Sequence, residues 1–96
     1  MSNMRFVWDE RKARLNLAKH GVSFVEAETV FLDDNARLID DPDHSADEDR
    51  FLLLGYSDHA RCLIVSHCYR ESESVIRLIS ARRATPHEEE SYWRLR

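Results

Sequence analysis

The chain has 96 residues, of which 43% are hydrophobic and 33% are charged, and its formal net charge at pH 7 is -4. A chain of this length builds one modest core, so we expect a single domain over residues 1–96, with no cofactor and no separate lid domain. No stretch approaches the roughly 18 apolar residues of a membrane span, so we expect a cytoplasmic protein that does not contact a membrane.

Charged residues are unevenly distributed along the chain, and the two cysteines are too far apart to form a disulfide. Residues 33–49 hold eight acids and one arginine, whereas residues 50–96 hold eight arginines and six acids. An acidic loop and a basic surface can therefore coexist, although the net charge argues against a general nucleic-acid binder. Cys62 and Cys68 lie in one predicted strand, about 20 Å apart at the rise of a strand, which is too far for a disulfide.

The first third of the chain predicts a short strand at residues 5–8 and two helices. Asp9 has the type of a helix N-cap and Gly21 that of a helix end, so a helix is expected between them. Its core-facing residues are expected to be Ala13, Leu17 and Ala18. Asn16 on this helix either faces a partner or bonds to a neighbouring loop, and its spacing does not decide which. Ser23 and Glu26 form a capping box for a second helix.

The second helix is expected to run to about Leu32, after which the pattern changes to β-rich runs with short polar connections. These runs cover residues 36–39, 51–56, 61–69 and 74–81. Short connections favour an antiparallel meander. We therefore expect a single small α+β domain of order β-α-α-β-β-β-β-α, with the helices packed on one face of a twisted, mainly antiparallel sheet.

Two arginines precede the last helix. Thr85 has the type of an N-cap, Pro86 suits the first helical position, and Glu88 lies three residues after the cap, so a capping box begins this helix. Arg82 and Arg83 end the preceding strand beside the helix N-terminus, a place that favours anions. Adjacent strand residues point to opposite faces, so one of the two is expected to turn toward the helices.

A histidine and an acidic loop are further candidates for chemistry. Along residues 61–69, period two places His67 near the rim of the sheet, where it serves either as a general acid or base or as a structural side chain. A metal at Asp41, Asp43 and His44 is disfavoured, because the loop lacks the glycine-broken pattern of a calcium hand. A solvated loop that protects the edge of the sheet is the preferred interpretation.

Several separated motifs resemble one family, the BrnT-type toxins of bacterial type II toxin–antitoxin modules, which are ribonucleases with a RelE-like fold. The motifs are Trp8-Asp9-Glu10 with Lys12, Asn16, Lys19-His20-Gly21, Phe24 with Glu26 and Ala27, Asp41-Pro42-Asp43-His44-Ser45 leading to Arg50-Phe51, His67, Ile79-Ser80-Ala81-Arg82 with Ala84-Thr85, and Glu88 with Tyr92. The resemblance covers most of the chain.

The resemblance implies a toxin that cleaves RNA and inhibits translation. It also implies a cognate ribbon-helix-helix antitoxin, through which alone the toxin meets operator DNA. The expected catalytic residues are Arg82, Glu88, His67 and Tyr92, and the expected RNA-binding residues are Arg83, Arg70 and Arg77. RNA supplies its own nucleophile in the 2′-hydroxyl, so we expect no metal ion. Arg82 and Arg83 are expected to bind phosphate and stabilise the phosphorane, His67 or Glu88 to transfer a proton, and Tyr92 to stack on or bond to the substrate.

Two other functions remain open at this stage. A non-catalytic binding module, or a degenerate toxin that acts as co-repressor with its antitoxin, predicts complex formation without cleavage. A nuclease that uses a metal on the acidic loop predicts inhibition by EDTA. The run Glu88-Glu89-Glu90 stands where similar toxins often have lysine or arginine, so weaker attraction of RNA phosphates is expected.

Overall fold

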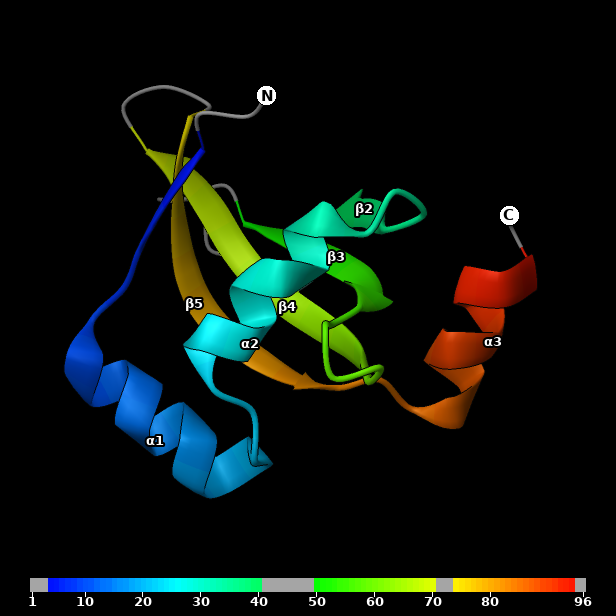
Figure 1. Ribbon diagram of the computed structural model, residues 1–96, viewed down its shortest axis with the longest axis horizontal. Coiled ribbons are helices and arrows are strands. Elements are labelled where there is room, and N and C mark those ends of the chain that lie inside the picture. Colours follow the sequence, from blue (N-terminus) through cyan, green and yellow to red (C-terminus); the bar gives the residue numbers. More distant parts are fainter. Residues whose placement is uncertain (1–3, 41–49, 71–73, 95–96) are drawn as a thin grey trace.

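The computed structural model describes residues 4–40, 50–70 and 74–94 of the chain (Figure 1). Its elements follow the predicted order of one strand, two helices, four strands and a last helix. A 3-10 turn, η1, extends the second helix to Leu32, as predicted. The elements are β1 (Arg5–Val7), α1 (Glu10–His20), α2 (Phe24–Thr29), η1 (Val30–Leu32), β2 (Arg37–Asp40), β3 (Phe51–Tyr56), β4 (Cys62–Arg70), β5 (Val75–Arg83) and α3 (Pro86–Arg94).

Caps confirm the predicted start and end of α1 and the predicted start of α2. The Asp9 side chain accepts a hydrogen bond from a first-turn backbone N–H at 3.1 Å, and Gly21 ends α1 in the left-handed conformation at φ 70°. Ser23 caps α2 by accepting from the Glu26 N–H at 3.0 Å. The Glu26 carboxylate is instead paired with Arg61, so the predicted capping box is only half formed.

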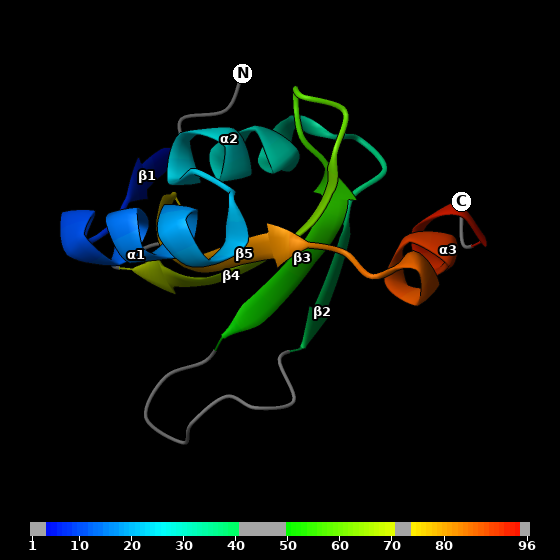
Figure 2. The same ribbon diagram turned by 90° about the horizontal axis from the view of Figure 1, so that it is seen from below.

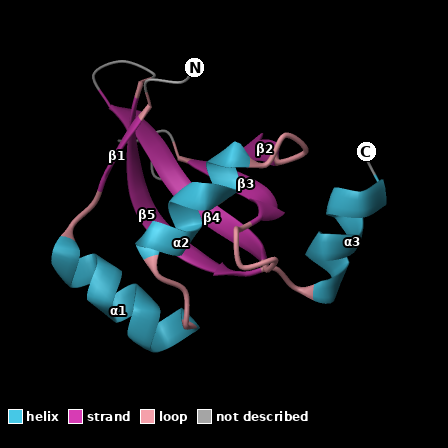
Figure 3. Ribbon diagram, viewed as in Figure 1, coloured by secondary structure: helices cyan, strands magenta, loops and turns pink. Residues whose placement is uncertain are grey.

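The strands form a single sheet of order β1-β5-β4-β3-β2 (Figure 3). Strands β2 to β5 pair antiparallel in sequence order, which confirms the predicted meander. Strand β1 joins the other edge by pairing parallel to β5. The α+β fold with a mainly antiparallel sheet is therefore as predicted.

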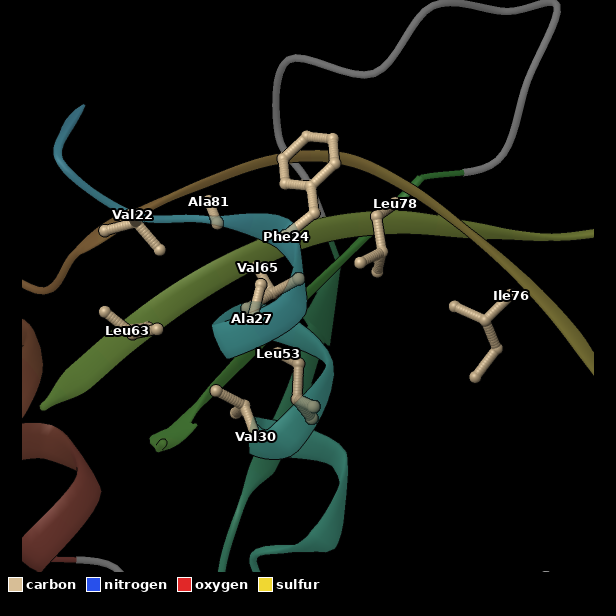
Figure 4. Packing of buried hydrophobic residues seen from close by; sticks show 10 residues of the cluster. All are labelled: Val22, Phe24, Ala27, Val30, Leu53, Leu63, Val65, Ile76, Leu78 and Ala81. Carbon is tan, nitrogen blue, oxygen red and sulfur yellow. The ribbon is translucent and has the colours of Figure 1, made fainter. Parts of the chain in front are cut away.

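The main core lies between the sheet and the first two helices, and α1 and α2 cover the same face of the sheet (Figure 2). Helix α2 brings apolar side chains down onto the central strands (Figure 4). The buried members are Val22, Phe24, Ala27, Val30, Leu53, Leu63, Val65, Ile76, Leu78 and Ala81.

Helix α3 packs on the opposite face, so the prediction that all helices share one face was wrong. Tyr92 of α3 packs against Leu54, Cys62 and Ile64, which alternate along β3 and β4 with residues of the main core. The physical reason lies in β4, which is apolar on both faces and therefore needs a covering layer on each side. The arginine-rich end of β5 thus leads to a helix on the side away from α1 and α2.

Helix α1 is rotated relative to the prediction. Leu17 is 51% exposed and Ala18 is exposed, whereas Asn16 is buried at 7% exposure. The Asn16 amide donates to Val22 O at 2.9 Å and to Ala81 O at 2.8 Å, and it accepts from the Ala81 N–H at 3.1 Å. The sequence left open whether Asn16 faces a partner or bonds within the chain. In the structure its amide bonds to the backbone N–H and C=O of Ala81, as the backbone of a strand paired with β5 would.

Strand β5 contains a β-bulge. The pairs on either side of it are His67 with Leu78 and Ser66 with Ser80. Ile79 is therefore one residue too many for the ladder, and an extra residue inverts the alternation of sides beyond it. As a result Leu78 and Ala81 both face the main core, and Arg82 faces the other way.

We predict that Asn16→Ala lowers the free energy of unfolding by about 2–4 kcal/mol, because it leaves three buried backbone groups without partners. Asn35→Ala, at an exposed asparagine in the turn before β2, is the matched control and should stay within about 0.5 kcal/mol of wild type. Urea unfolding followed by circular dichroism measures both. Equal stability of Asn16→Ala and Asn35→Ala would show that the amide bridge contributes nothing.

Candidate active site

Five arginines from four strands share the face of the sheet that α1 and α2 leave uncovered. They are Arg5 in β1, Arg37 in β2, Arg70 in β4, and Arg77 and Arg82 in β5. Side chains of a strand alternate between the two sides of the sheet, and residues paired across neighbouring strands face the same side. In this register all five arginines face away from the main core. In the described strands, no residue on this side is acidic. We call this surface the arginine face.

Arg82 is held by a two-point ion pair with the first turn of α3. Its Nη1 and Nη2 donate to the two Glu88 carboxylate oxygens at 2.9 and 3.0 Å, and Nη1 also donates to Arg83 O at 3.2 Å. Glu88 accepts from the Thr85 N–H at 2.8 Å, while the Thr85 hydroxyl accepts from the Glu88 N–H at 3.1 Å. The predicted capping box is thus confirmed, and the same carboxylate orients the guanidinium.

Arg82 and Glu88 are both charged at neutral pH. The hydrogen bonds from Arg82 lower the pKa of Glu88 to about 2, and those to Glu88 raise the pKa of Arg82. Glu88 is therefore ionised at neutral pH and is a weak base, which suits it to positioning Arg82 rather than to taking a proton. Among the described residues, these contacts engage three of the five guanidinium N–H groups, so Arg82 keeps donors for an anion.

Tyr92 is built into the structure instead of facing a substrate. Its side chain is 3% exposed, and its hydroxyl donates to Asp33 Oδ2 at 2.8 Å. Its ring packs edge to face with the ring of Tyr56, with the two ring centroids 5.1 Å apart. Asp33 Oδ2 also accepts from the Tyr56 N–H at 2.9 Å. The expected stacking of Tyr92 on RNA is corrected accordingly, because the buried ring anchors α3 to β3 and to the turn after η1.

Glycine at position 55 permits this anchoring. A Cβ there would lie 2.9 Å from Ala36 Cβ, 3.0 Å from Val30 Cγ1 and 3.1 Å from Asp33 Oδ2. The contact with Ala36 is shorter than real Cβ contacts and the other two are tight, so a side chain here would push η1 and the Asp33 carboxylate away from β3, which glycine avoids. The site thus depends on a residue that the sequence analysis did not single out.

A second contact between α3 and β3 was also missed from the sequence. The Tyr56 hydroxyl donates to the Glu89 carboxylate and accepts from Trp93 Nε1 at 3.2 Å. The Glu89 carboxylate raises the pKa of Tyr56, so the phenol stays protonated at neutral pH. The signal that could have revealed this cluster is the one-turn spacing of Glu89 and Trp93, which puts both on one side of α3.

His67 is far from where the sequence analysis expected it. Its side chain is 0% exposed, and its ring centroid lies 4.9 Å from that of Phe31 and 5.4 Å from that of Tyr69. It lies on the side of the sheet opposite Arg82. The rim position was wrong because β4 is a central strand and η1 covers it. Burial lowers the pKa of His67, and Nε2 has no hydrogen-bond partner among the described residues. This geometry does not support proton transfer at Arg82.

The other expected RNA-binding residues divide between the two sides. Arg70 and Arg77 lie on the arginine face with Arg82, whereas the exposed Arg83 is paired with Leu63 and lies on the helical side. Arg70 lies six residues along β4 from the partner of Arg82, about 20 Å away at the rise of a strand. The arginine face therefore extends along the sheet. Arg5 and Arg37 were missed because strand register cannot be derived from either strand alone.

The described residues offer neither a reactive thiol nor a metal centre. The thiol of Cys62 is buried, which raises its pKa to about 11 and keeps it protonated, and Cys68 is also buried. Residues 4–40, 50–70 and 74–94 contain no cluster of three or more metal-ligating side chains and no helix long and apolar enough to cross a membrane. The metal candidate Asp41, Asp43 and His44 lies outside the described residues.

Comparison with known proteins agrees with this fold. The family described as "Ribonuclease toxin, BrnT, of type II toxin-antitoxin system" matches residues 8–88. The crystal structure of the Brucella abortus ribonuclease toxin, BrnT, superposes with a TM-score of 0.64 and 26% sequence identity, over 85% of this chain and 97% of that chain. A comparison with curated protein sequences gave no significant match.

This chain belongs to the BrnT family of ribonuclease toxins of type II toxin–antitoxin systems. The resemblance drawn from the sequence motifs is thereby confirmed. Membership of a type II system implies an antitoxin as partner.

We predict that the buried His67 makes folding sensitive to pH. An unfolded histidine takes a proton below about pH 6.5, whereas the folded one, with its lowered pKa, resists protonation. The free energy of unfolding should therefore be level above pH 6.5 and fall as the pH drops from 6.5 to 5. In His67→Phe, which keeps an aromatic ring, this fall should be smaller. Identical pH profiles of wild type and variant, measured by urea unfolding, would contradict the prediction.

Proposed function

We propose that this chain cleaves RNA without a metal ion and that RNA binds along the arginine face. The observation that carries the proposal is the arginine face itself, with Arg82 fixed on it by Glu88. Arginine matches the geometry of phosphate through its planar fork of donors. A local concentration of five arginines attracts the RNA backbone even though the net charge of the chain is -4.

The chemistry that this surface supports is in-line attack by the 2′-oxygen of the RNA on its own phosphate. The 2′-hydroxyl gives its proton to solvent water, the bond between phosphorus and the 5′-oxygen breaks, and the leaving 5′-oxygen takes a proton from water, so that a 2′,3′-cyclic phosphate remains. Arg82 stabilises the extra negative charge that develops on the phosphorane, and its fixed orientation avoids reorganisation during the reaction. Glu88 is a positioning residue in this mechanism, because its low pKa makes it a poor base. Arg70 and Arg77 bind neighbouring phosphates of the same strand.

The three glutamates of α3 weaken RNA binding less than their number suggests. Glu88 is paired with Arg82 and Glu89 is bound to the Tyr56 hydroxyl, so both have structural roles. Glu90 is exposed and lies 4.0 Å from His87. We infer that Glu88 and Glu89 both position α3, and that only Glu88 has its charge offset by a cation, namely Arg82.

The antitoxin of this system is proposed to be a ribbon-helix-helix protein that neutralises the toxin by covering the arginine face. Covering that surface excludes RNA and hides Arg82. Binding to operator DNA then belongs to the antitoxin, and the free toxin acts in the cytoplasm by cleaving RNA and so inhibiting translation.

One observation favours a second candidate, a degenerate toxin that acts as co-repressor with its antitoxin. His67 is sealed on the other side of the sheet, and Glu88 is a weak base, so the two expected proton-transfer groups do not serve Arg82. Without proton transfer a ribonuclease loses about 10²–10⁴-fold in rate. This candidate predicts complex formation with the antitoxin and no detectable cleavage.

We predict that Arg82→Ala reduces RNA cleavage at least about 10²-fold, because it removes the cation nearest the reacting phosphate. Arg83→Ala is the matched control, since it changes the adjacent arginine on the helical side and should stay within about threefold of wild type. Arg82→Lys keeps the charge but loses the two-point contact and should fall between the two. Cleavage of a labelled RNA by purified protein measures all three.

Three outcomes of that experiment would contradict the proposal. Equal loss in Arg82→Ala and Arg83→Ala would assign the effect to general charge, and no cleavage by the wild type would favour the co-repressor. Loss of wild-type activity in EDTA would favour a metal-dependent nuclease. Growth arrest on induced expression, relieved by Arg82→Ala, provides the matching test in cells.

We predict that the contact with RNA extends to the far end of β4. Arg70→Ala should weaken binding to single-stranded RNA for all sequences alike and should reduce the slope of log K against log salt by about 0.7, the value for one phosphate contact. Arg11→Ala, at an exposed arginine of α1 on the helical side, should leave the slope unchanged. A binding titration at increasing salt concentrations measures both slopes. A larger change of slope in Arg11→Ala than in Arg70→Ala would indicate that RNA binds on the helical side, which would contradict the proposal.

A further inference from the structure

Helices α1 and α2 lie side by side over the same face of the sheet (Figure 2). An apolar groove is lined by residues of α1 and of the start of α2, on this helical side of the molecule. Its volume is about 250 Å³. The lining residues are Trp8, Glu10, Ala13, Arg14, Leu17, Ser23, Phe24 and Val25. The arginine face is on the other side of the sheet, so this groove is separate from the proposed RNA site.

The groove exists because of the rotation of α1. With Asn16 bonded to strand β5, Leu17 is left exposed, while Ala13, one turn earlier, is half-buried against the main core, and both line the groove. Trp8 and Phe24, whose rings meet edge to face at 5.8 Å, also line the groove. At its rim Leu17 is 51% exposed and Val25 is 65% exposed. Two large aliphatic side chains are thus left in water beside an apolar hollow.

The size and lining of the groove indicate the kind of ligand. Sites for drug-sized molecules and cofactors occupy about 300–1,000 Å³, so this groove is small for them but holds one or two large apolar side chains. Its mainly aliphatic rim lacks the row of arginines that attracts RNA phosphates. An amphipathic protein segment that inserts an apolar anchor fits both features.

The charge of α1 defines that segment further. The helix carries four cations against one acid. They are Arg11, Lys12, Arg14 and Lys19 against Glu10. Arg14 and Glu10 both line the groove, and Arg11 is exposed three residues from Arg14, so cations still outnumber acids along the helix beside the groove. The complementary segment is therefore acidic. A second copy of the chain fits less well, because two chains of net charge -4 repel each other.

We propose that this groove anchors an acidic, amphipathic segment of the antitoxin, with an apolar side chain of that segment inserted beside Leu17 and Val25. The proposal rests on the proposed function in one respect, namely that an antitoxin binds this toxin. It adds a second contact area, because a segment in the groove leaves the arginine face uncovered. Anchoring at the groove supplies affinity, and a different part of the antitoxin blocks the RNA site.

The test compares two leucines of α1 that are both exposed. Leu17→Glu places a carboxylate at the groove, whereas Leu15→Glu makes the same change at a leucine that is 58% exposed and does not line it. Calorimetric titration with the purified cognate antitoxin should show at least about 30-fold weaker binding for Leu17→Glu. Leu15→Glu should bind within about threefold of wild type. Circular dichroism checks that both variants are folded.

RNA cleavage separates this proposal from the proposed function. Free Leu17→Glu should cleave RNA as the wild type does, and saturating antitoxin should still inhibit it fully, only at higher concentration. Unchanged antitoxin affinity of Leu17→Glu, or equal weakening by Leu15→Glu, would overturn the groove as an anchor. Reduced self-association of Leu17→Glu in sedimentation, without a change in antitoxin affinity, would overturn it in favour of a second copy. The affinity comparison stands even if the wild type cleaves no RNA.

Discussion

Ile79 is one residue more than the β4–β5 ladder can pair, and the side on which each later residue of β5 lies depends on it. Without this extra residue, strict alternation would put Arg77 and Arg82 on opposite sides of the sheet. With it, both lie on the arginine face. Asn16 secures the shifted strand, because its amide bonds to the N–H and the C=O of Ala81 just beyond the bulge. One hydrogen-bonded side chain thus links the orientation of α1 to the composition of the site.

The same link divides the molecule into two working surfaces. Turning Asn16 toward β5 leaves Leu17 exposed and opens the groove beside α2, while the bulge gathers arginines on the far side. A toxin that must bind both RNA and an antitoxin gains from such a separation, because affinity for the antitoxin then need not be built into the residues that contact RNA. The proposed anchor and the proposed active site can therefore change independently.

Helix α3 shows how a net negative chain can keep a basic site. Its acids are used locally: Glu88 caps the helix and orients Arg82, and Glu89 binds the Tyr56 hydroxyl. Tyr92 and Asp33 complete the attachment of α3 to β3. Glycine at position 55 of β3 leaves room for the Asp33 carboxylate. The pair of Arg82 and Glu88 is neutral as a whole, so Arg82 acts on a bound anion mainly through its oriented hydrogen-bond donors.

Local patterns in the sequence determined the elements, their order and the helix ends, because caps, turns and strand propensity act over a few residues. The motifs also determined the family, and the box at Thr85 and Glu88 was predicted in full. Tertiary structure alone decided which side of the sheet each residue faces. The bulge depends on pairing with β4, the burial of His67 on η1, and the rotation of α1 on the bonds of Asn16 to β5. Each is a contact between residues distant in sequence, and periodicity within one element cannot reveal it.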